Sequence, residues 1–295
     1  MALKPYISLL RPKQYLKNTF VFAALVFSNS FRDFHLVLLT FLAFTAMCAV
    51  SSATYIVNDA IDVERDRRHP KKKTRPIAAG LVSLTAAYRL AIALLVIGLE
   101  IALTLGSITV LILVSYLLLQ VLYNWKLKRE PVADVFTIAL GFVLRAVLGA
   151  AAISVPISGW LLFCTGSIAL MLGFAKRRHE FLLHGDTARE SLAHYNKLVL
   201  DAFVLMFAIG ASMFYAIYSI QSSTALKYPL LPISVPFVIY GISRYLWLTF
   251  TQDEGGEPAD LILKDPHILL VIAGFILSTL FILSGESRFI SSNDD

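Results

Sequence analysis

Apolar runs of about 20 residues recur along almost the whole chain, and this feature limits its possible folds more than any other. An α-helix of that length crosses the hydrocarbon core of a bilayer. Of the 295 residues, 57% are hydrophobic and 16% are charged, whereas a soluble domain has roughly 25% charged residues. The alternating amphipathic strands of an outer-membrane barrel are missing from the sequence. The sequence therefore predicts an all-α polytopic membrane protein with a single domain over residues 1–295.

Nine spans are expected when the sequence is read with a window of about 20 residues. The first is the weakest, because polar side chains occupy its beginning, from Gln14 to Asn18. No removable signal peptide is expected, since no short apolar stretch with a small-residue cleavage site comes before it. The nine spans are 14–30, 35–57, 84–104, 107–124, 132–153, 158–176, 198–220, 229–250 and 267–284.

The basic residues are distributed unevenly over the two sides of this topology. Of the 26 Lys and Arg residues, 22 fall on the side of the N-terminus, and Arg145 falls inside the fifth span. Because basic loops stay in the cytoplasm, the N-terminus is expected inside and the C-terminus outside. Topology then accounts for much of the net charge of +6, and no nucleic-acid binding is predicted.

Two long charged loops, at 58–83 and 177–197, are expected to carry the function, since functional residues gather in such loops. In the first loop, three aspartates and one asparagine fall on one face of an inward continuation of the second span. Like charges on one face repel each other unless a divalent cation neutralises them, and hard oxygen ligands suit Mg²⁺. These four residues are Asn58, Asp59, Asp62 and Asp66.

Six basic residues follow this acidic face directly, between Arg67 and Arg75. Acidic side chains that hold a metal, next to basic side chains that bind phosphate, are the components of a diphosphate site. The alternative is a solvated loop whose cations serve membrane topology and whose aspartates balance them. The helical spacing of the acids, which begins at the membrane boundary, favours the diphosphate site.

The acidic pattern resembles the Asn-Asp-x-x-Asp-x-x-x-Asp signature of the UbiA-type prenyltransferase superfamily, and helix count and loop placement extend the resemblance over nearly the whole chain. The resemblance implies a nine-helix bundle with a cytoplasm-facing polar cavity, in which a Mg²⁺-bound diphosphate is cleaved. It implies catalytic roles for Asp59, Asp62 and Asp66, and metal ligation by these three residues together with Asn58.

The loop after the sixth span departs from that family's pattern. Members usually carry a second Asp-rich motif there, whereas this sequence has three consecutive cations, Lys176 to Arg178, followed by His179 and Glu180. One carboxylate cluster and a second basic cluster suit a donor with an additional phosphate, or two phosphorylated substrates. Positive-inside charge at the end of the span is the alternative explanation.

Three segments look like the decaprenyl-phosphate phosphoribosyltransferase branch of the superfamily: Arg11–Asn18, His69–Gly80 and Lys176–Glu180. The match departs at Tyr15, where Trp is expected. The resemblance implies transfer of 5-phosphoribosyl from phosphoribosyl diphosphate (PRPP) to a polyprenyl phosphate, with release of pyrophosphate, for arabinan precursors of the cell wall. It also implies a bacterial inner (plasma) membrane location.

Substrate binding is assigned partly from that resemblance and partly from charge. Tyr123 and Lys128 resemble a pair that the superfamily places beside the diphosphate, although anchoring at the membrane interface also explains them. The residues assigned to substrate binding are Lys17, Asn58, Lys71, Lys73, Arg75, Tyr123, Lys128, Arg145, Lys176, Arg177, Arg178, Glu180 and Tyr195.

Arg145 shares a helical face with Asp134 but lies roughly 16 Å deeper along the axis, so the two side chains cannot pair. An Arg in lipid costs about 2.5–3.5 kcal/mol or more, so Arg145 must face a polar cavity or find an acceptor. Two roles stay open for it, a purely structural one and contact with or support of a phosphate.

Two other functions remain as alternatives. A prenyltransferase for aromatic acceptors, as in quinone or haem synthesis, would need two Asp motifs. A membrane transporter would explain charge at mid-membrane. The sequence also leaves open whether the chain forms a homo-oligomer.

Overall fold

The computed structural model describes residues 3–70, 72–185, 190–251, 261 and 264–285, without the side chains of Leu3, His184 and Glu190. Within these ranges the chain forms helices and connecting turns, and no strand occurs. Eight of the described helices are long and apolar enough to cross a membrane. Many of their large apolar side chains are exposed, as expected for helices that face lipid. The chain is therefore a multi-pass helical membrane protein.

The chain divides into two compact units. The first consists of Met1–Leu25, Ser30–Trp125 and Leu144–Val155. The second consists of Val26–Asn29, Lys126–Val143 and Pro156–Asp295. Helix α7 (Ala133–Ala152) belongs to both, because its first half packs in the second unit and its second half in the first.

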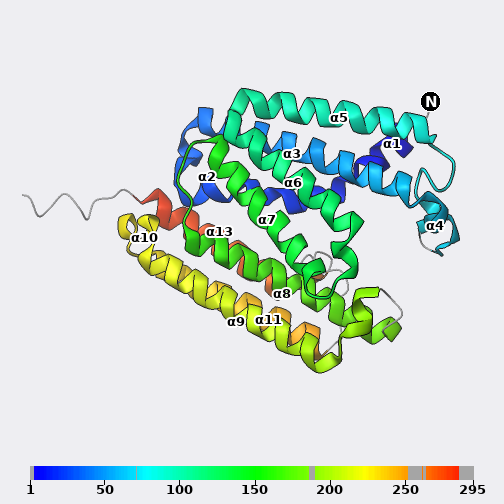
Figure 1. Ribbon diagram of the computed structural model, residues 1–295. Helices are drawn as coiled ribbons and strands as arrows, with labels where there is room; N and C mark the ends of the chain where they lie inside the picture. Colours follow the sequence, from blue (N-terminus) through cyan, green and yellow to red (C-terminus); the bar gives the residue numbers. More distant parts are fainter. Residues whose placement is uncertain (1–2, 71, 186–189, 252–260, 262–263, 286–295) are drawn as a thin grey trace, which may run out of the picture. The chain divides into compact units, whose positions relative to one another are not determined.

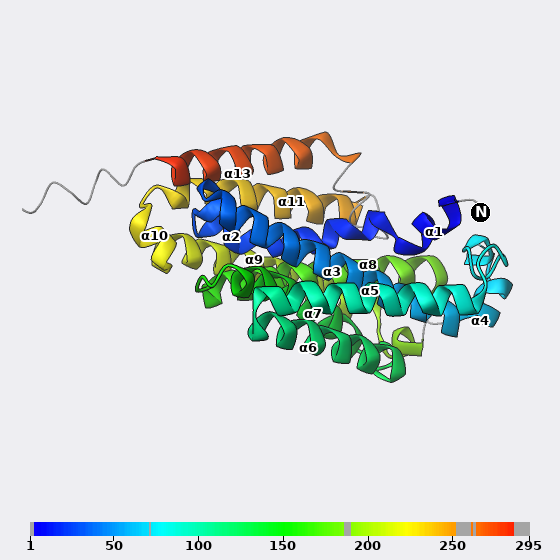
Figure 2. The ribbon, with the colours of Figure 1, turned by 90° about the horizontal axis from the view of Figure 1, so that it is seen from above.

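The first unit is built on α3 (Phe34–Ile61), α5 (Leu84–Leu105) and α6 (Ser107–Trp125). Helices α3 and α5 lie side by side (Figures 1 and 2). Gly98 permits this approach, since a Cβ there would stand 3.1 Å from the Ala46 carbonyl oxygen. The shorter segments are α1 (Leu3–Leu10), the 3₁₀ helix η1 (Pro12–Phe22), η2 (Ser30–Arg32), α4 (Val63–Arg68) and η3 (Lys72–Thr74).

The second unit is built on α8 (Gly159–His184), α9 (Lys197–Gln221), α11 (Val235–Thr251) and α13 (Pro266–Ser284). Figure 2 shows α11 beside α13, and α8 packs along α9. Asp265 caps α13 by accepting the Ile268 N–H at 2.9 Å, and its hydrogen bond from Arg244 lowers the pKa of its carboxyl group. The shorter segments are η4 (Leu127–Arg129), η6 (Glu190–His194), α10 (Ser223–Lys227) and η7 (Leu231–Ser234).

The expected first span, 14–30, is not a regular membrane-crossing helix. Its residues form η1, followed by the five-residue α2 (Ala23–Phe27) and a turn. Eight of the nine expected spans therefore have a long apolar helix among the described residues. The segment 14–30 differs from the other spans because the polar side chains of Tyr15 and Asn18 in η1 hydrogen-bond to α3.

The charged segment after the expected sixth span is helical for longer than predicted. Helix α8 continues to His184, so Arg177, Arg178 and Glu180 lie on a helix and not in a loop. Helix α3 likewise continues to Ile61, which places Asn58 and Asp59 in its last turn. The predicted spans end too early because a hydropathy window stops at the first charged residues. The helices themselves continue into the charged segments, where their polar side chains form hydrogen bonds and ion pairs.

Gly149 of α7 lies directly against the backbone of η1. A Cβ at this position would overlap the carbonyl oxygen of Val21 in η1. Gly149→Ala is therefore expected to destabilise the protein by about 1–3 kcal/mol or more, because the backbone of η1 would have to move. Thermal unfolding in detergent measures this. In the control Gly166→Ala, the added Cβ has its nearest neighbour at 3.6 Å, and a large loss there too would contradict the explanation.

Candidate functional site

The end of α3 carries a cluster of buried carboxylates and arginines. Arg75 Nη1 donates to Asp59 Oδ1 at 2.9 Å and to Asp66 Oδ2 at 2.6 Å, so one guanidinium nitrogen joins both carboxylates. Arg11 Nη2 donates to Asp59 Oδ1 at 2.5 Å. Both aspartates are buried, whereas both arginines remain partly exposed. Asp59 and Asp66, which helical spacing predicts to lie on one face, thus share one arginine partner.

Helical geometry is interrupted between these two aspartates. Asp62 lies between α3 and α4, with its N–H bonded to the Asn58 carbonyl at 2.9 Å. Asn58 and Asp62 are both half-buried. Asp66 comes back toward Asp59 because α4 continues the chain for six residues after this junction.

Arg11 has a strained backbone, with φ 52° in the left-handed region. A non-glycine residue in that region costs of order 1–3 kcal/mol, and such residues cluster where a side chain must be aimed. The Arg11 guanidinium lies 5.0 Å from the centre of the Tyr55 ring as well as against Asp59. Its position is therefore fixed by an ion pair and a cation–π contact together.

The cluster has the donor chemistry of a site for a divalent cation. Among the described residues, no three or more His, Cys, Asp or Glu side chains converge as a metal site would require. Two buried carboxylates nevertheless converge on one cationic nitrogen of Arg75. Carboxylate and carboxamide oxygens are the ligands that Mg²⁺ prefers, often with only one or two carboxylates from the protein. Asp59 and Asp66, with Asn58 and Asp62 adjacent, therefore fit such an ion.

A row of polar side chains on α3 faces η1 in the first unit. Tyr15 bonds to Ser52 at 3.0 Å, and Asn18 Nδ2 donates to Ser51 at 3.2 Å. Ser52 in turn donates to the carbonyl oxygen of Leu10 at 2.9 Å. These contacts continue the Arg11–Asp59 pair along the helix and hold η1 against α3.

Arg145 has the acceptors that its depth in a membrane helix demands. Its Nε donates to Asn18 Oδ1 at 2.8 Å and its Nη2 to the Tyr116 hydroxyl at 3.1 Å. The guanidinium also lies 4.9 Å from the centre of the Tyr116 ring. Arg145 is buried and belongs to the same polar network as η1.

Arg145→Leu is expected to lower stability by about 1–3 kcal/mol for each buried acceptor that it strands, namely Asn18 and Tyr116. Thermal unfolding in detergent, together with the yield of inserted protein, measures the effect. The control is Arg32→Leu, because Arg32 is exposed. Equal and small effects for the two variants would refute a buried network around Arg145.

A second cluster lies in the second unit and joins α7, α8 and η6. Arg177 Nε donates to Asp134 Oδ2 at 2.7 Å, and its Nη1 donates to Glu180 Oε2 at 2.9 Å. Ser191 donates to the same Asp134 oxygen at 3.4 Å, and Asp134 and Arg177 are both fully or almost fully buried. The predicted run of cations therefore contains a buried ion pair that ties three elements together.

Arg178 is likewise buried, on another face of α8. Its Nε donates to Asp201 of α9 at 2.6 Å, and its Nη1 donates to the Thr249 carbonyl of α11 at 2.9 Å. The guanidinium lies 4.9 Å from the Phe250 ring centre. Lys176, the first residue of the run, is half-buried on the same helix.

Tyr195 supports a second strained residue next to Asp134. Val132 has φ 66°, a genuine outlier for a β-branched residue, and its N–H donates to the Tyr195 hydroxyl. Burial raises the pKa of Tyr195. Strained backbone thus occurs at both clusters, at Arg11 in one and at Val132 in the other.

The remaining predicted residues differ in exposure. Lys17 and Lys73 are exposed, and Tyr123 and Lys128 are half-buried. Lys71 lies outside the described residues.

Sequence reasoning did not assign several partners to the site: Arg11, Asn18, Tyr55, Tyr116, Asp134 and Ser191. One signal could have indicated part of this network. Ser51, Ser52, Tyr55 and Asp59 recur at helical spacing within an apolar run. Polar residues on one face of a membrane helix usually face the protein interior.

Eight long apolar helices and two buried clusters of carboxylates and arginines define a membrane protein with an ionic site. The sequence matches the UbiA prenyltransferase family over residues 18–261. The chain belongs to this family and is a membrane transferase.

Relatives with curated names are similar over most of their length. The decaprenyl-phosphate phosphoribosyltransferase of Corynebacterium glutamicum is 38% identical over 278 residues, which cover 90% of this chain and 82% of that protein. The protein of the same name from Mycobacterium tuberculosis is 30% identical over 92% of this chain and 91% of its own length. A UbiA homologue from Archaeoglobus fulgidus bound to GPP and Mg²⁺ shares the fold, with a TM-score of 0.73, 17% identity, and coverage of 95% of this chain and 100% of that one.

Proposed function

We propose that this protein transfers the 5-phosphoribosyl group of PRPP to the phosphate of a polyprenyl phosphate, of the decaprenyl type, and releases pyrophosphate. The observation that carries the proposal is the cluster of Asp59, Asp66 and Arg75, because it combines oxygen ligands for a cation with a donor for phosphate. The names of relatives up to 38% identical support the same reaction.

The reaction forms one bond and breaks another at the same carbon. An oxygen of the acceptor phosphate bonds to C1 of the ribose, and the bond from C1 to the pyrophosphate oxygen breaks. The acceptor phosphate is already anionic, so the protein need not remove a proton from it. The electron pair of the broken bond leaves on pyrophosphate, and the protein must therefore stabilise negative charge on that group.

Asn58, Asp59, Asp62 and Asp66 would hold Mg²⁺ on the diphosphate. The bound ion would neutralise charge on the departing pyrophosphate. Arg75 pairs with both buried carboxylates and Arg11 pairs with Asp59, and these ion pairs hold the carboxylates in the cluster. In this proposal Arg75 also donates to the diphosphate, and its partial exposure supports that role.

Arg177 and Arg178 act as positioning residues in this proposal. Each has a carboxylate partner in a buried environment, Asp134 for Arg177 and Asp201 for Arg178. Their partners fix α7 and α9 against α8, and η6 is held through Ser191. Of the predicted run of cations, Lys176 is the residue proposed to bind phosphate directly. In the orientation that the basic loops predict, these clusters face the cytoplasm from a bacterial inner membrane.

Purified protein in lipid nanodiscs, with Mg²⁺, radiolabelled PRPP and decaprenyl phosphate, tests the reaction. Label is expected in the organic phase after extraction, and excess chelator should abolish it. Transfer that persists in chelator would remove the metal from the proposal.

A parallel incubation with a prenyl diphosphate and 4-hydroxybenzoate tests the alternative prenyltransferase reaction. An alkylated ring in that incubation, with no labelled lipid in the first, would show that the donor is a prenyl diphosphate and the acceptor is aromatic, and would refute the proposed reaction. In protein reconstituted into closed lipid vesicles, flux of solute without consumption of a diphosphate would identify a transporter instead.

A further inference from the structure

Arg11, which pairs with Asp59, is carried by a segment with little stability of its own. It stands immediately before η1, a 3₁₀ helix of 11 residues. Runs of 3₁₀ helix longer than about four residues are uncommon, because their hydrogen bonds have poorer geometry than those of an α-helix. Contacts with the rest of the first unit must therefore fix where η1 lies, and with it where Arg11 lies.

Asn18 ties η1 to two other helices. Its Nδ2 donates to Ser51 Oγ and to Cys48 Sγ of α3, each at 3.2 Å, and its Oδ1 accepts from Arg145 of α7 at 2.8 Å. Arg145 in turn donates to Tyr116 of α6. Asn18 is fully buried, and a carboxamide engaged at both its oxygen and its nitrogen is held in one orientation. Arg145 thus fixes the rotation of η1 against α3.

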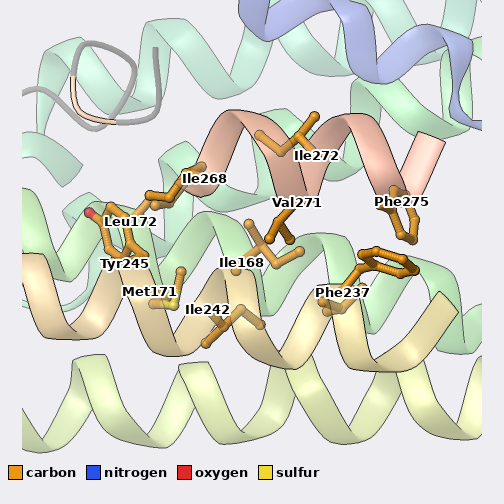
Figure 3. Close-up of a pocket in the computed structure, with 12 residues that line it drawn as sticks. Ile168, Met171, Leu172, Phe237, Ile242, Tyr245, Ile268, Val271, Ile272 and Phe275 are labelled. Carbon is orange, nitrogen blue, oxygen red and sulfur yellow. The ribbon is translucent and has the colours of Figure 1, made fainter. Parts of the chain in front are cut away.

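Hydrogen bonds of this kind fix a register that apolar contacts leave loose. In the second unit the side chains between α8, α11 and α13 are mostly apolar, and they leave a cavity of about 220 Å³ (Figure 3). Apolar cores tolerate several packings, whereas a satisfied polar network specifies one. Burial of an arginine in a membrane helix is costly, so the presence of Arg145 indicates that η1 must take one particular position.

The backbone at Arg11 makes the aspartate site sensitive to that position. Arg11 has φ 52° and ψ 57°, and a strained residue keeps such a conformation only when its surroundings over-determine it. On one side its guanidinium contacts Asp59 and the Tyr55 ring. On the other side Asn18 lies further along η1, roughly 14 Å away along the helix axis. A rotation or shift of η1 at Asn18 would therefore move Arg11 relative to Asp59.

We propose that Arg145 is a positioning residue for the aspartate site, which acts through Asn18 and η1 to keep Arg11 on Asp59 and does not contact substrate. The inference rests on the proposed function, because it takes the Asp59 cluster to bind the diphosphate. It extends that function, because it makes the affinity for diphosphate depend on a side chain inside a helix long and apolar enough to span the membrane.

Binding of radiolabelled pyrophosphate with Mg²⁺, measured by equilibrium dialysis on protein in nanodiscs, tests the proposal without requiring transfer. Arg145→Lys keeps the charge but loses the fork that reaches both Asn18 and Tyr116. It is expected to raise the dissociation constant about tenfold, the effect of one charge-assisted hydrogen bond. Equal affinity in the native protein and in Arg145→Lys would refute the proposal.

Two substitutions of Asn18 test the intermediate step. Asn18→Leu removes the acceptor and should weaken binding as Arg145→Lys does. Asn18→Asp keeps an acceptor for Arg145 on a side chain of the same shape and should stay within about twofold of the native affinity. Equal losses in the two Asn18 variants would show that the contact with Arg145 is not what matters, and would overturn the proposal.

Double variants separate positioning from a general loss of structure. If Arg145 acts through Arg11, Arg145→Lys should change the affinity by less than about twofold in an Arg11→Met background. Arg75→Met is the matched control, because Arg75 pairs with the same Asp59 oxygen but directly follows η3 and is not carried by η1. In that background the loss should persist. An equal loss in both backgrounds would show that Arg145 supports the fold in general, and would overturn the proposal.

Hydrogen exchange gives a readout that does not depend on any ligand. Backbone amides of η1 should exchange faster in Arg145→Lys and Asn18→Leu than in the native protein, whereas those of residues 72–82, which carry Arg75, should not change. Faster exchange in both segments would indicate general loosening and overturn the positioning role.

This proposal and the proposed function can fail separately. Coupling between Arg145 and Arg11 in pyrophosphate binding, in a protein that transfers no phosphoribosyl group, would uphold the positioning role and refute the reaction. Transfer with an unchanged dependence on PRPP in Arg145→Lys would uphold the reaction and refute the positioning role. A native protein that binds no pyrophosphate would refute both the diphosphate site at Asp59 and the positioning role.

Discussion

Asp59→Asn is expected to lower kcat for phosphoribosyl transfer by about 10²- to 10³-fold, the range found when one preorganised stabiliser of developing charge is removed. The substitution keeps the size of the side chain but removes the charge shared by Arg11 and Arg75. Asp66→Asn should act in the same direction, because its carboxylate meets the same nitrogen of Arg75. Initial rates at saturating PRPP and polyprenyl phosphate measure both effects.

Glu64→Gln is the matched control, because Glu64 also lies on α4 but its side chain is 72% exposed and pairs with exposed Arg67. It should retain near-normal activity. The dependence of rate on Mg²⁺ separates two explanations: a metal ligand predicts a higher Mg²⁺ requirement in Asp66→Asn, whereas a purely structural role predicts lower thermal stability at an unchanged requirement. Normal turnover in both aspartate variants would remove the proposed diphosphate site.

Asp134→Leu is expected to destabilise the protein by about 3–5 kcal/mol, because it leaves the buried Arg177 without its closest carboxylate. Glu180 would still accept a hydrogen bond from Nη1 of Arg177. The Nε atom, which donates to Asp134, would lose its partner, and Glu180 is partly exposed. Removing one member of a buried pair costs more than removing both. The double variant Asp134→Leu with Arg177→Met should therefore recover most of the lost stability.

Unfolding of the single and double variants in detergent gives the coupling energy between the two side chains. The exposed Glu64–Arg67 pair is the reference, and Arg67→Gln should change stability by less than about 1 kcal/mol. Losses that simply add in the double variant would show that Asp134 and Arg177 are not coupled. Low activity with full stability in Arg177→Met would instead indicate that Arg177 binds phosphate directly, as the sequence predicts.

The membrane class of this protein follows from sequence alone. Eight of the nine expected spans, from 35–57 to 267–284, coincide with long helices, and several boundaries agree within one or two residues. Such agreement is expected because the bilayer fixes the length of an apolar helix. The segment 14–30 does not form one long helix. It is apolar enough to be read as a span, but its polar residues hydrogen-bond to α3.

The acidic motif and the cationic run were also visible in sequence, but their partners were not. Spacing predicted that Asp59 and Asp66 share a face, and family resemblance predicted their chemistry. Neither could indicate that Arg75 joins them, because the loop that returns Arg75 to α3 has no periodicity to read.

Sequence by itself determined the class, the family and the identity of the acidic motif, since these depend on hydropathy and on residues near one another in the chain. The tertiary structure alone decided which partners the buried arginines have. Arg145 donates to Asn18 across 127 positions, and Arg177 forms an ion pair with Asp134 across 43. Hydrogen bonds and ion pairs depend on distances of a few ångströms between side chains, and those distances are set only when separate helices pack together.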